Sequence, residues 1–368
     1  MSTDQLKAIE QNLVDALGTV RELLAVPSPP VVGAYDAFGT TELLAKLASA
    51  TGGETITAKS GYAYEGFTIT GITPASEVAI VGEAGARFGQ VMISKSSKLS
   101  VSAEFVLDAP PVRTSATPYF VRALPDTSEI VVQSSQFFSR VDADAYTTWD
   151  LATWYAWRMG GALLDGPDSA VVGCLGIGLN AGFSVGGVRS RILGNVLRGV
   201  SRDAYRLTAD FCAAEDNSVE DMISLGDGNH PDMLQCFEAG DGRLSGLRIL
   251  RNDLRALVNI QGNPLAATAQ GIGGYGSPKA GGGSINTTFD DLIVEDNHVE
   301  ATAWNGINLT IVQDGAVRRN TVIDPYGRTD GHARLRITGL CANTFVEDNR
   351  APRLIIAAAA TQSGNVQV

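Results

Sequence analysis

Residues 293–323 read IVEDNHVEATAWNGINLTIVQDGAVRRNTVI, and this stretch decides the fold. A short apolar segment, a polar turn ending in Asn297 and a second short apolar segment recur 23 residues later around Asn320. An asparagine at a fixed turn can adopt the left-handed conformation and hydrogen-bond its neighbours above and below. We therefore expect a ladder of stacked asparagines, made of Asn195, Asn217, Asn252, Asn297, Asn320 and Asn349.

The spacing of these asparagines predicts a solenoid of short strands. The intervals between them are 22, 35, 45, 23 and 29 residues. A repeat of about 20–29 residues suits a three-sheet coil that packs only on its neighbours. The two longer intervals predict inserted loops. The fold class is therefore expected to be all-β.

Composition agrees with many short strands and excludes several other classes. The 368 residues are 44% hydrophobic and 18% charged, with 41 glycines, which excludes a disordered chain. The net charge is −12 and no basic run is present, which argues against a nucleic-acid binder. The four cysteines form no CxxC pair and have apolar neighbours, which predicts buried free thiols. We expect no cofactor and no metal, since the calcium-binding nonapeptide repeats are absent.

The N-terminal 26 residues are predicted to be a docking or oligomerisation helix. Within residues 3–25, apolar side chains follow the alternating three- and four-residue spacing of a heptad seam. Such a short helix needs a partner, which is a copy of itself, another protein or its own domain. Residues 27–40 contain three prolines and are expected to be a linker.

Residues 41–52 predict a second, short helix, which ends at Gly52-Gly53. Alternating strand patterns follow at once in GGETITAKSGYAYEGFTITGI, residues 52–72. This sequence of a helix and strands resembles the N-terminal cap and first coils of right-handed parallel β-helix proteins of the pectate-lyase-like superfamily. The resemblance covers residues 41–368 and implies a right-handed parallel β-helix solenoid with an N-terminal α-helix and a short capping helix.

Two segments are expected to be insertions. Residues 140–168 hold Trp149, Trp154 and Trp157, which would stack on sugars if exposed and would anchor a helical excursion if buried. Residues 262–287 are glycine-rich, and their composition favours a loop over a coil. A phosphate-binding role for this loop is disfavoured, since it lacks the GK[ST] signature.

The densest polar cluster is GDGNHPDMLQ, residues 226–235. It leads into a strand in which Leu234 and Cys236 are expected to face inward and Gln235 outward. Aligning the coils by this alternation predicts one outward column, with Asp203 above Asp232 in the same register. The members of this column are Arg206, Gln235, Asn259, Asn308 and Arg336.

These residue types suit chemistry on polysaccharides. Hydrolysis needs an acid and a second carboxylate, and a lyase or epimerase needs a base for a carbon-bound proton. The catalytic candidates are His230, Asp232 and Asp203, with Arg206 as a clamp for a sugar carboxylate. Asp227 and Asn229 join the outward column as ligand-binding candidates. Binding without catalysis and an ordinary structural turn stay open as alternatives.

The order of helix, proline-rich linker and β-helix resembles phage tailspikes, tail fibres, head spikes and the spikes of gene transfer agents. The turn Asn229-His-Pro-Asp232 resembles that of β-helix proteins from bacterial viruses. It also loosely resembles a turn of alginate epimerases and lyases, but lacks their Asp-Pro-His order. The alternative function is thus a polysaccharide lyase, hydrolase or C5-epimerase, and a third is a structural fibre.

The resemblance to spikes implies a virion-surface protein that attaches to bacterial capsule or lipopolysaccharide. Residues 3–25 would dock on the particle, and the β-helices would stand as a homotrimer. The sequence shows no signal-peptide pattern and no apolar stretch of membrane-spanning length. We therefore expect synthesis in a host cytoplasm, release by lysis and no membrane insertion.

Overall fold

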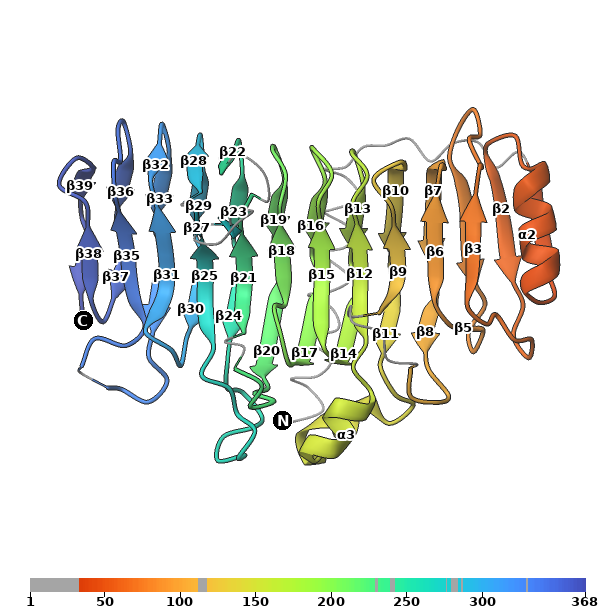
Figure 1. Cartoon of the computed structure of the whole chain (residues 1–368), viewed down its shortest axis with the longest axis horizontal. Helices are drawn as coiled ribbons and strands as arrows, with labels where there is room; N and C mark the ends of the chain where they lie inside the picture. Colours follow the sequence, from red (N-terminus) through yellow and green to blue (C-terminus); the bar gives the residue numbers. More distant parts are fainter. Residues whose placement is uncertain are drawn as a thin grey trace, which may run out of the picture.

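The computed structural model describes residues 33–111, 118–228, 231–238, 242–275, 277–278, 284–285, 287–328 and 330–368. Stacked coils run along the long axis, from helix α2 (Thr40–Ser49) at one end to the last strands at the other (Figure 1). Each full coil contributes strands to three parallel sheets, here named sheets A, B and C. The chain is therefore a parallel β-helix, as predicted, while the helix predicted for residues 3–25 lies outside the described residues.

Parallel strands make up all three large sheets. Sheet A contains β1 (Gly33–Ala37), β2 (Glu54–Ala58), β4 (Val78–Gly82), β7 (Ser97–Ser102), β10 (Ser128–Gln133), β13 (Ala170–Val172), β16 (Arg191–Leu193), β19 (Ala213–Glu215), β23 (Arg248–Leu250), β29 (Ile293–Glu295), β33 (Ala316–Arg318), β36 (Phe345–Glu347) and β39 (Thr361–Ser363). Sheet B contains β5 (Arg87–Phe88), β8 (Glu104–Val106), β11 (Gln136–Phe138), β14 (Leu175–Leu179), β17 (Val196–Val200), β20 (Ser218–Met222), β24 (Asp253–Arg255), β30 (His298–Glu300), β34 (Thr321–Ile323), β37 (Arg350–Ala351) and β40 (Val366–Gln367). Sheet C contains β3 (Phe67–Thr70), β6 (Val91–Ser94), β9 (Tyr119–Ala123), β12 (Gly160–Leu164), β15 (Ala181–Val185), β18 (Tyr205–Leu207), β21 (Asp232–Cys236), β25 (Gln270–Gly274), β31 (Asn305–Thr310), β35 (Arg334–Thr338) and β38 (Leu354–Ile356).

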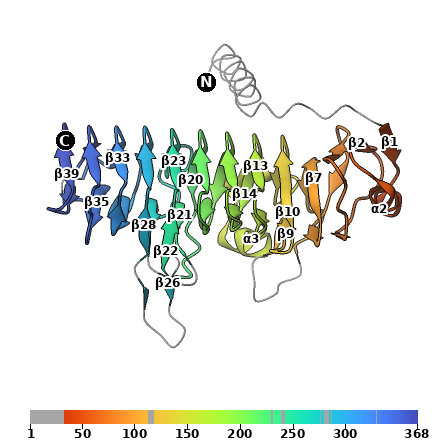
Figure 2. The same cartoon turned by 90° about the horizontal axis from the view of Figure 1, so that it is seen from above.

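The smaller elements lie in the connections between coils. A three-stranded parallel sheet joins β22 (Arg243–Ser245), β28 (Thr288–Asp290) and β32 (Val312–Gln313), and an antiparallel hairpin joins β26 (Ser277–Pro278) and β27 (Ser284–Ile285). A 3-10 helix η1 (Ala143–Thr148) and helix α3 (Leu151–Ala156) follow β11. Figure 2 shows that α3, β22 and β26 project from one side of the solenoid.

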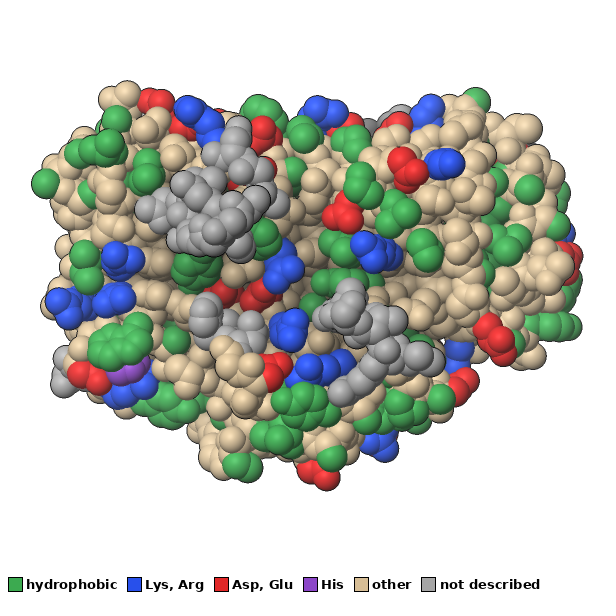
Figure 3. All heavy atoms as spheres, viewed as in Figure 1, with side chains coloured by type: hydrophobic (Ala, Val, Ile, Leu, Met, Phe, Trp, Pro, Cys, Tyr) green, Lys and Arg blue, Asp and Glu red, His purple; other side chains and the backbone are tan. Residues whose placement is uncertain are grey.

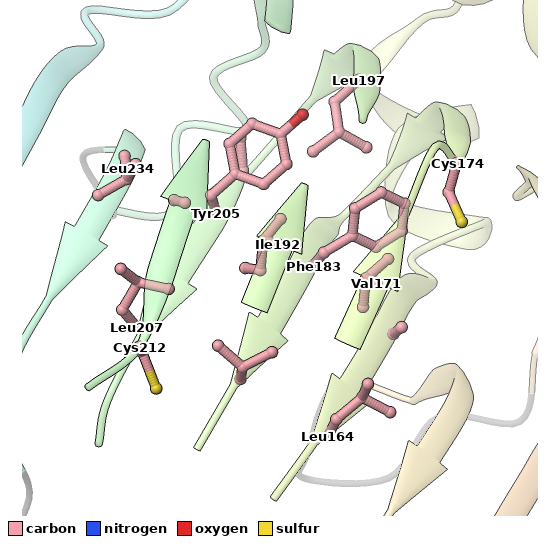
Figure 4. Packing of buried hydrophobic residues seen from close by; sticks show 14 of the residues in the cluster. Leu164, Val171, Cys174, Phe183, Ile192, Leu197, Tyr205, Leu207, Cys212 and Leu234 are labelled. Atoms are coloured by element: carbon pink, nitrogen blue, oxygen red, sulfur yellow. The ribbon is translucent and has the colours of Figure 1, made fainter. Parts of the chain in front are cut away.

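The interior is a continuous apolar stack, because every coil turns its alternate side chains inward. Figure 4 shows Phe183 and Tyr205 from neighbouring coils pointing into this interior. Aromatic rings stack from coil to coil, with centroids 4.8 Å apart for the pair Tyr64 and Phe88. All four cysteines are free and buried, as predicted from their apolar neighbours.

The predicted asparagine ladder is confirmed. Each side-chain amide donates to the carbonyl oxygen of the next, for example from Asn217 to Asn252 at 2.9 Å and from Asn252 to Asn297 at 2.9 Å. The ladder runs without a break from Asn195 to Asn349 and continues to Asn365, which the repeat pattern did not reveal. Every rung satisfies a buried amide that would otherwise cost about 1–3 kcal/mol.

One detail of the ladder differs from the prediction. The left-handed residue is the one before each asparagine, for example Asp216 (φ 56°), Arg251 (φ 55°) and Asp296 (φ 58°). That backbone turn directs the following asparagine side chain inward beneath the corner, where it meets the next rung. The charges at this corner alternate in sign, and Arg251 contacts Asp216 at 2.8 Å while Arg319 contacts Asp296 at 2.8 Å.

Helix α2 closes the first coil, as predicted for a capping helix. Its Leu43 and Leu47 are one helical turn apart and fully buried against the end of the core. Burying a leucine contributes about 1.5–3 kcal/mol, so the two together stabilise an end that would otherwise expose apolar side chains. The range predicted as a linker, residues 27–40, is wrong for Gly33–Ala37, which pairs with β2 as the first strand of sheet A.

The loop predicted over residues 262–287 is wrong for Gln270–Gly274, which forms β25 of sheet C. The glycines here are required by close packing. A Cβ atom on Gly271 would lie 2.1 Å from the carbonyl oxygen of Gly306, and one on Gly274 would lie 2.7 Å from the ring of Phe289. The insertion predicted over residues 140–168 likewise ends early, because Gly160–Leu164 is strand β12.

Candidate functional site

The outer face of sheet C carries the predicted polar column. The register pairs Arg206 with Gln235, then Gln235 with Gly273, Gly273 with Asn308 and Asn308 with Arg336. Four of the five predicted members therefore lie in one row across β18, β21, β25, β31 and β35. We call Arg206, Gln235, Asn308 and Arg336 the outward row.

Asn259 is the predicted member that does not belong to the outward row. It lies in the connection after β24, where its side-chain amide donates to Asp221 Oδ2 at 2.9 Å. Asp221 is fully buried and also accepts a hydrogen bond from Tyr146, so this cluster anchors the η1 segment. The prediction failed because the strand of sheet C in this long coil begins only at Gln270.

Asp203 and Asp232 lie on neighbouring coils, as predicted. The backbone N–H of Asp232 donates to Oδ1 of Asp203 at 3.1 Å. Oδ2 of Asp203 forms an ion pair with the guanidinium of Arg206. The side chain of Asp203 is thus held in place by a backbone donor on one oxygen and a cation on the other.

Asp232 occupies the opposite kind of environment. Its side chain is fully buried, and it accepts hydrogen bonds from Gln235 Nε2 at 3.0 Å and from the Tyr275 hydroxyl at 3.1 Å. Burial, followed by the charge of Asp203, raises the pKa of Asp232 to about 8. The hydrogen bonds and Arg206 oppose this rise but do not cancel it. Asp232 is therefore largely protonated at neutral pH.

Two tyrosines lie flat on sheet C at glycine positions near this pair. A Cβ atom on Gly273 would lie 2.1 Å from the ring of Tyr275, so only glycine leaves room for that ring. A Cβ atom on Gly160 would lie 2.5 Å from the ring of Tyr119. Burial raises the pKa of both tyrosines, and both respond to the charge of Asp203. The Tyr275 ring thus lies against buried Asp232, while the Tyr119 ring is close enough to Asp203 to respond to its charge.

The polar surface continues toward the C-terminal coils. The Asn305 amide hydrogen-bonds the side chain of Gln270, and Arg334 Nε donates to Asn305 Oδ1 at 3.1 Å. Arg336 donates to Asn308 at 3.0 Å. Figure 3 shows this face hollowed near its middle, with acidic and basic side chains gathered in the hollow. Polar side chains on β31 and β35 are therefore tied to one another and to Gln270 of β25 by hydrogen bonds.

The tryptophans of the 140–168 segment are not a platform for sugars. Trp149 and Trp154 are buried and meet edge to face, with ring centroids 5.0 Å apart. They form a second apolar core outside sheet B, together with Tyr146, Ile177 and other side chains. Trp149 and Trp154 therefore anchor the segment as buried side chains, which was one of the two predicted roles. Trp157 is half-buried.

The remaining predicted site residues do not join the carboxyl pair in the described structure. Asp227 forms ion pairs with Arg158 at 3.0 Å and with Arg202 at 3.7 Å, beside helix α3. Asn229 and His230 lie outside the described residues. Within the part of the chain that the structure describes, no three His, Cys, Asp or Glu side chains group as metal ligands, and no helix has the length and apolarity to cross a membrane.

Comparison with known proteins indicates likeness of fold only. No protein-family model and no curated protein sequence matches the chain. Among solved structures, the Dettilon tailspike protein is similar with a TM-score of 0.48 and 13% identity, over 89% of this chain and 61% of that one. Pectate lyase Pel9A is similar with a TM-score of 0.48 and 11% identity, over 92% of this chain and 80% of that one.

A further similar structure is a tailspike mutant of E. coli bacteriophage HK620 in complex with a pentasaccharide. Its TM-score is 0.46 at 12% identity, over 89% of this chain and 63% of the tailspike. The chain thus spans less than two thirds of the length of either tailspike. Pectate lyases and phage tailspikes are structural neighbours of this parallel β-helix.

Proposed function

We propose that the chain is a virion spike or fibre that binds bacterial capsule or lipopolysaccharide along the outer face of sheet C. The outward row carries this proposal. It places Arg206 and Gln235 on one pair of neighbouring strands and Asn308 and Arg336 on another, with strands about 4.8 Å apart. Gly273 and the Tyr275 ring lie between the two pairs, so a polysaccharide lying across the strands would meet polar groups on both sides of an aromatic ring. Fixed side chains on a rigid sheet bind with little loss of conformational entropy.

The assembly around this surface is part of the same proposal. The helix predicted for residues 3–25 attaches the chain to a phage or gene-transfer-agent particle, and three chains stand side by side as a homotrimer. Such a protein is made in the host cytoplasm and released by lysis. Deleting residues 1–26 should leave polysaccharide binding intact and abolish incorporation into particles, as measured by immunoblotting of purified virions.

A second candidate function is cleavage or modification of the same polysaccharide. The specific observation that favours it is the unequal carboxyl pair. Glycoside hydrolysis uses one protonated carboxyl group and a second carboxylate. Asp232, with its raised pKa, suits the first role, and Asp203, paired with Arg206, is the candidate for the second. For a lyase or epimerase, His230 is the candidate base and Arg206 the clamp for the sugar carboxylate.

One experiment separates the two functions. Purified protein is incubated with capsular and lipopolysaccharide preparations from candidate hosts, and binding, chain length and absorbance of unsaturated sugar ends are followed together. Binding without any change in chain length would support the spike. Depolymerisation that Asp232→Asn abolishes, with binding retained, would make the protein an enzyme. Because Asp232 is uncharged at neutral pH, asparagine is a close structural match.

A further inference from the structure

Trp304 differs from Trp149 and Trp154 in being exposed. It precedes strand β31, 48% of its surface is accessible, and its ring stacks on His332 with centroids 4.0 Å apart and planes at 21°. His332 Nδ1 in turn contacts the carboxylate of Asp330, which orients the imidazole. On the same face as the hollow, Figure 3 shows a histidine with hydrophobic, acidic and basic side chains around it. One face of the indole is therefore covered by the imidazole, which holds the ring in place, while about half of the side chain stays accessible to solvent.

Arg334 lies beside this ring, and Arg334 and its charged neighbours Arg336 and Arg353 have no compensating carboxylates in the described part of the chain. No Asp or Glu among the described residues forms an ion pair with Arg334, Arg336 or Arg353. Arg251 and Arg319, by contrast, each pair with acidic groups. The guanidinium of Arg334 lies 5.8 Å from the Trp304 ring centroid. Burial, followed by the charges of Arg336 and Arg353, lowers the pKa of Arg334. The positive charge is thus concentrated and available to an anion.

The two inner arginines are also held in place. Asn305 accepts from Arg334 at 3.1 Å and Asn308 accepts from Arg336 at 3.0 Å, through neutral oxygens that leave the cationic charge intact. Arg336 belongs to the outward row, which continues through Asn308 to Gln235. A polysaccharide that follows the row therefore reaches this cluster.

We infer that Trp304, Arg334 and Arg336 form a subsite for an acidic sugar residue, two to three strands away from Asp232. The electron-rich face of the indole stacks on the C–H face of a pyranose ring, and the guanidinium groups bind the carboxylate or phosphate on that sugar in bidentate fashion. This inference rests on the proposed function and adds the chemical class of the ligand to it.

Binding experiments on chemically altered polysaccharide test the ligand class. A bound polysaccharide is carboxyl-reduced in one arm and dephosphorylated in another, and affinities are measured by calorimetry. One of the two treatments should weaken binding about tenfold or more, since charge-assisted hydrogen bonds are lost. The double variant Arg334→Gln/Arg336→Gln should lose the same affinity for the untreated polymer. For the polymer whose treatment weakened binding, the double variant and the wild-type protein should have equal affinity. Arg350→Gln removes an arginine from sheet B and is the matched control.

The outcomes distinguish the two proposals. Equal affinity for untreated and treated polymers, or unchanged binding by the double variant, would overturn the subsite and leave the spike function standing. No binding of any polysaccharide by the wild-type protein would instead overturn the proposed function.

A second measurement needs no polysaccharide. Iodide should quench the fluorescence of Trp304, isolated as the difference between wild type and Trp304→Phe, several-fold more strongly than caesium does. The double arginine variant should abolish that preference while acrylamide quenching is unchanged. Equal quenching of Trp304 by iodide and caesium in the wild-type protein would overturn the anionic subsite, whatever the protein binds.

Discussion

Tyr275 donates its phenolic hydrogen to Asp232 at 3.1 Å across the position of Gly273, where any side chain would collide with the tyrosine ring. The glycine, the ring and the carboxyl thus form one unit on the outer face of sheet C. This unit buries Asp232, whereas Asp203 forms an ion pair with Arg206. The chemistry of the pair therefore depends on a residue that carries no side chain.

The hydroxyl of Tyr275 should control the titration of Asp232. Because this hydrogen bond lowers the pKa of Asp232, Tyr275→Phe should raise that pKa further above about 8. Carbon-13 NMR titration of labelled aspartate carboxyl groups in wild type and variant measures the shift. Tyr62→Phe, at an exposed position near the N-terminal coils, is the control. An unchanged or lower value in Tyr275→Phe would contradict the arrangement.

Stability should fall as pH rises through the range set by Asp232. The folded pKa of about 8 lies above the ordinary value of 3.8, so the unfolded chain releases this proton first. The free energy of unfolding should therefore decrease from about pH 4 to about pH 8, by up to several kcal/mol, and not further above that. Urea denaturation between pH 5 and pH 9 measures it, and Asp232→Asn should remove this contribution. Equal pH dependence in the two proteins would refute the assignment.

Alanine at Gly273 should displace Tyr275 from the sheet. The new Cβ atom would lie 2.1–2.5 Å from ring atoms, too close for any ordinary contact. We expect Gly273→Ala to lower stability by about 1–3 kcal/mol, the usual cost of overpacking. In a Tyr275→Ala background the same substitution should cost much less. A double-mutant cycle by chemical denaturation measures this coupling, and additive effects would show that the ring lies elsewhere.

An interior rung of the asparagine ladder should matter more than the last one. Asn252→Ala removes the acceptor of Asn217 and the donor to Asn297, all in buried positions, and should cost about 2–5 kcal/mol. Asn365→Ala affects a partly exposed rung at the end and should cost less. Thermal and chemical denaturation compare the two. Similar losses would mean that the ladder does not act through burial.

The sequence predicted the fold because the ladder is a local pattern repeated many times. An apolar–polar–Asn segment needs no knowledge of distant contacts, and Asp203 above Asp232 followed from counting within two adjacent coils. Asn259 was misplaced because the interval from Asn252 to Asn297 spans 45 residues, and spacing within a long insertion says nothing about register.

The parts of the site that sequence reasoning missed depend on geometry that local patterns do not show. Tyr275 stands in a glycine-rich segment that appeared flexible, and its role follows only from its ring folding back over Gly273 of β25 so that its hydroxyl reaches Asp232 on the adjoining strand β21. Trp304 was overshadowed by the three clustered tryptophans. A usable signal was present. Trp304 directly precedes strand β31, and the strand that pairs with β31 is β35, which begins with Arg334 and contains Arg336.

The alternating corner charges restrict how this solenoid can change length in evolution or design. Loss of the single coil that carries Arg251 would set Asp216 against Asp296, and two like charges on adjacent strands repel. Loss of two successive coils would instead set Asp216 against Arg319 and restore attraction. In this region the natural unit of growth or shortening is a pair of coils, and duplications of one coil should require a compensating charge reversal.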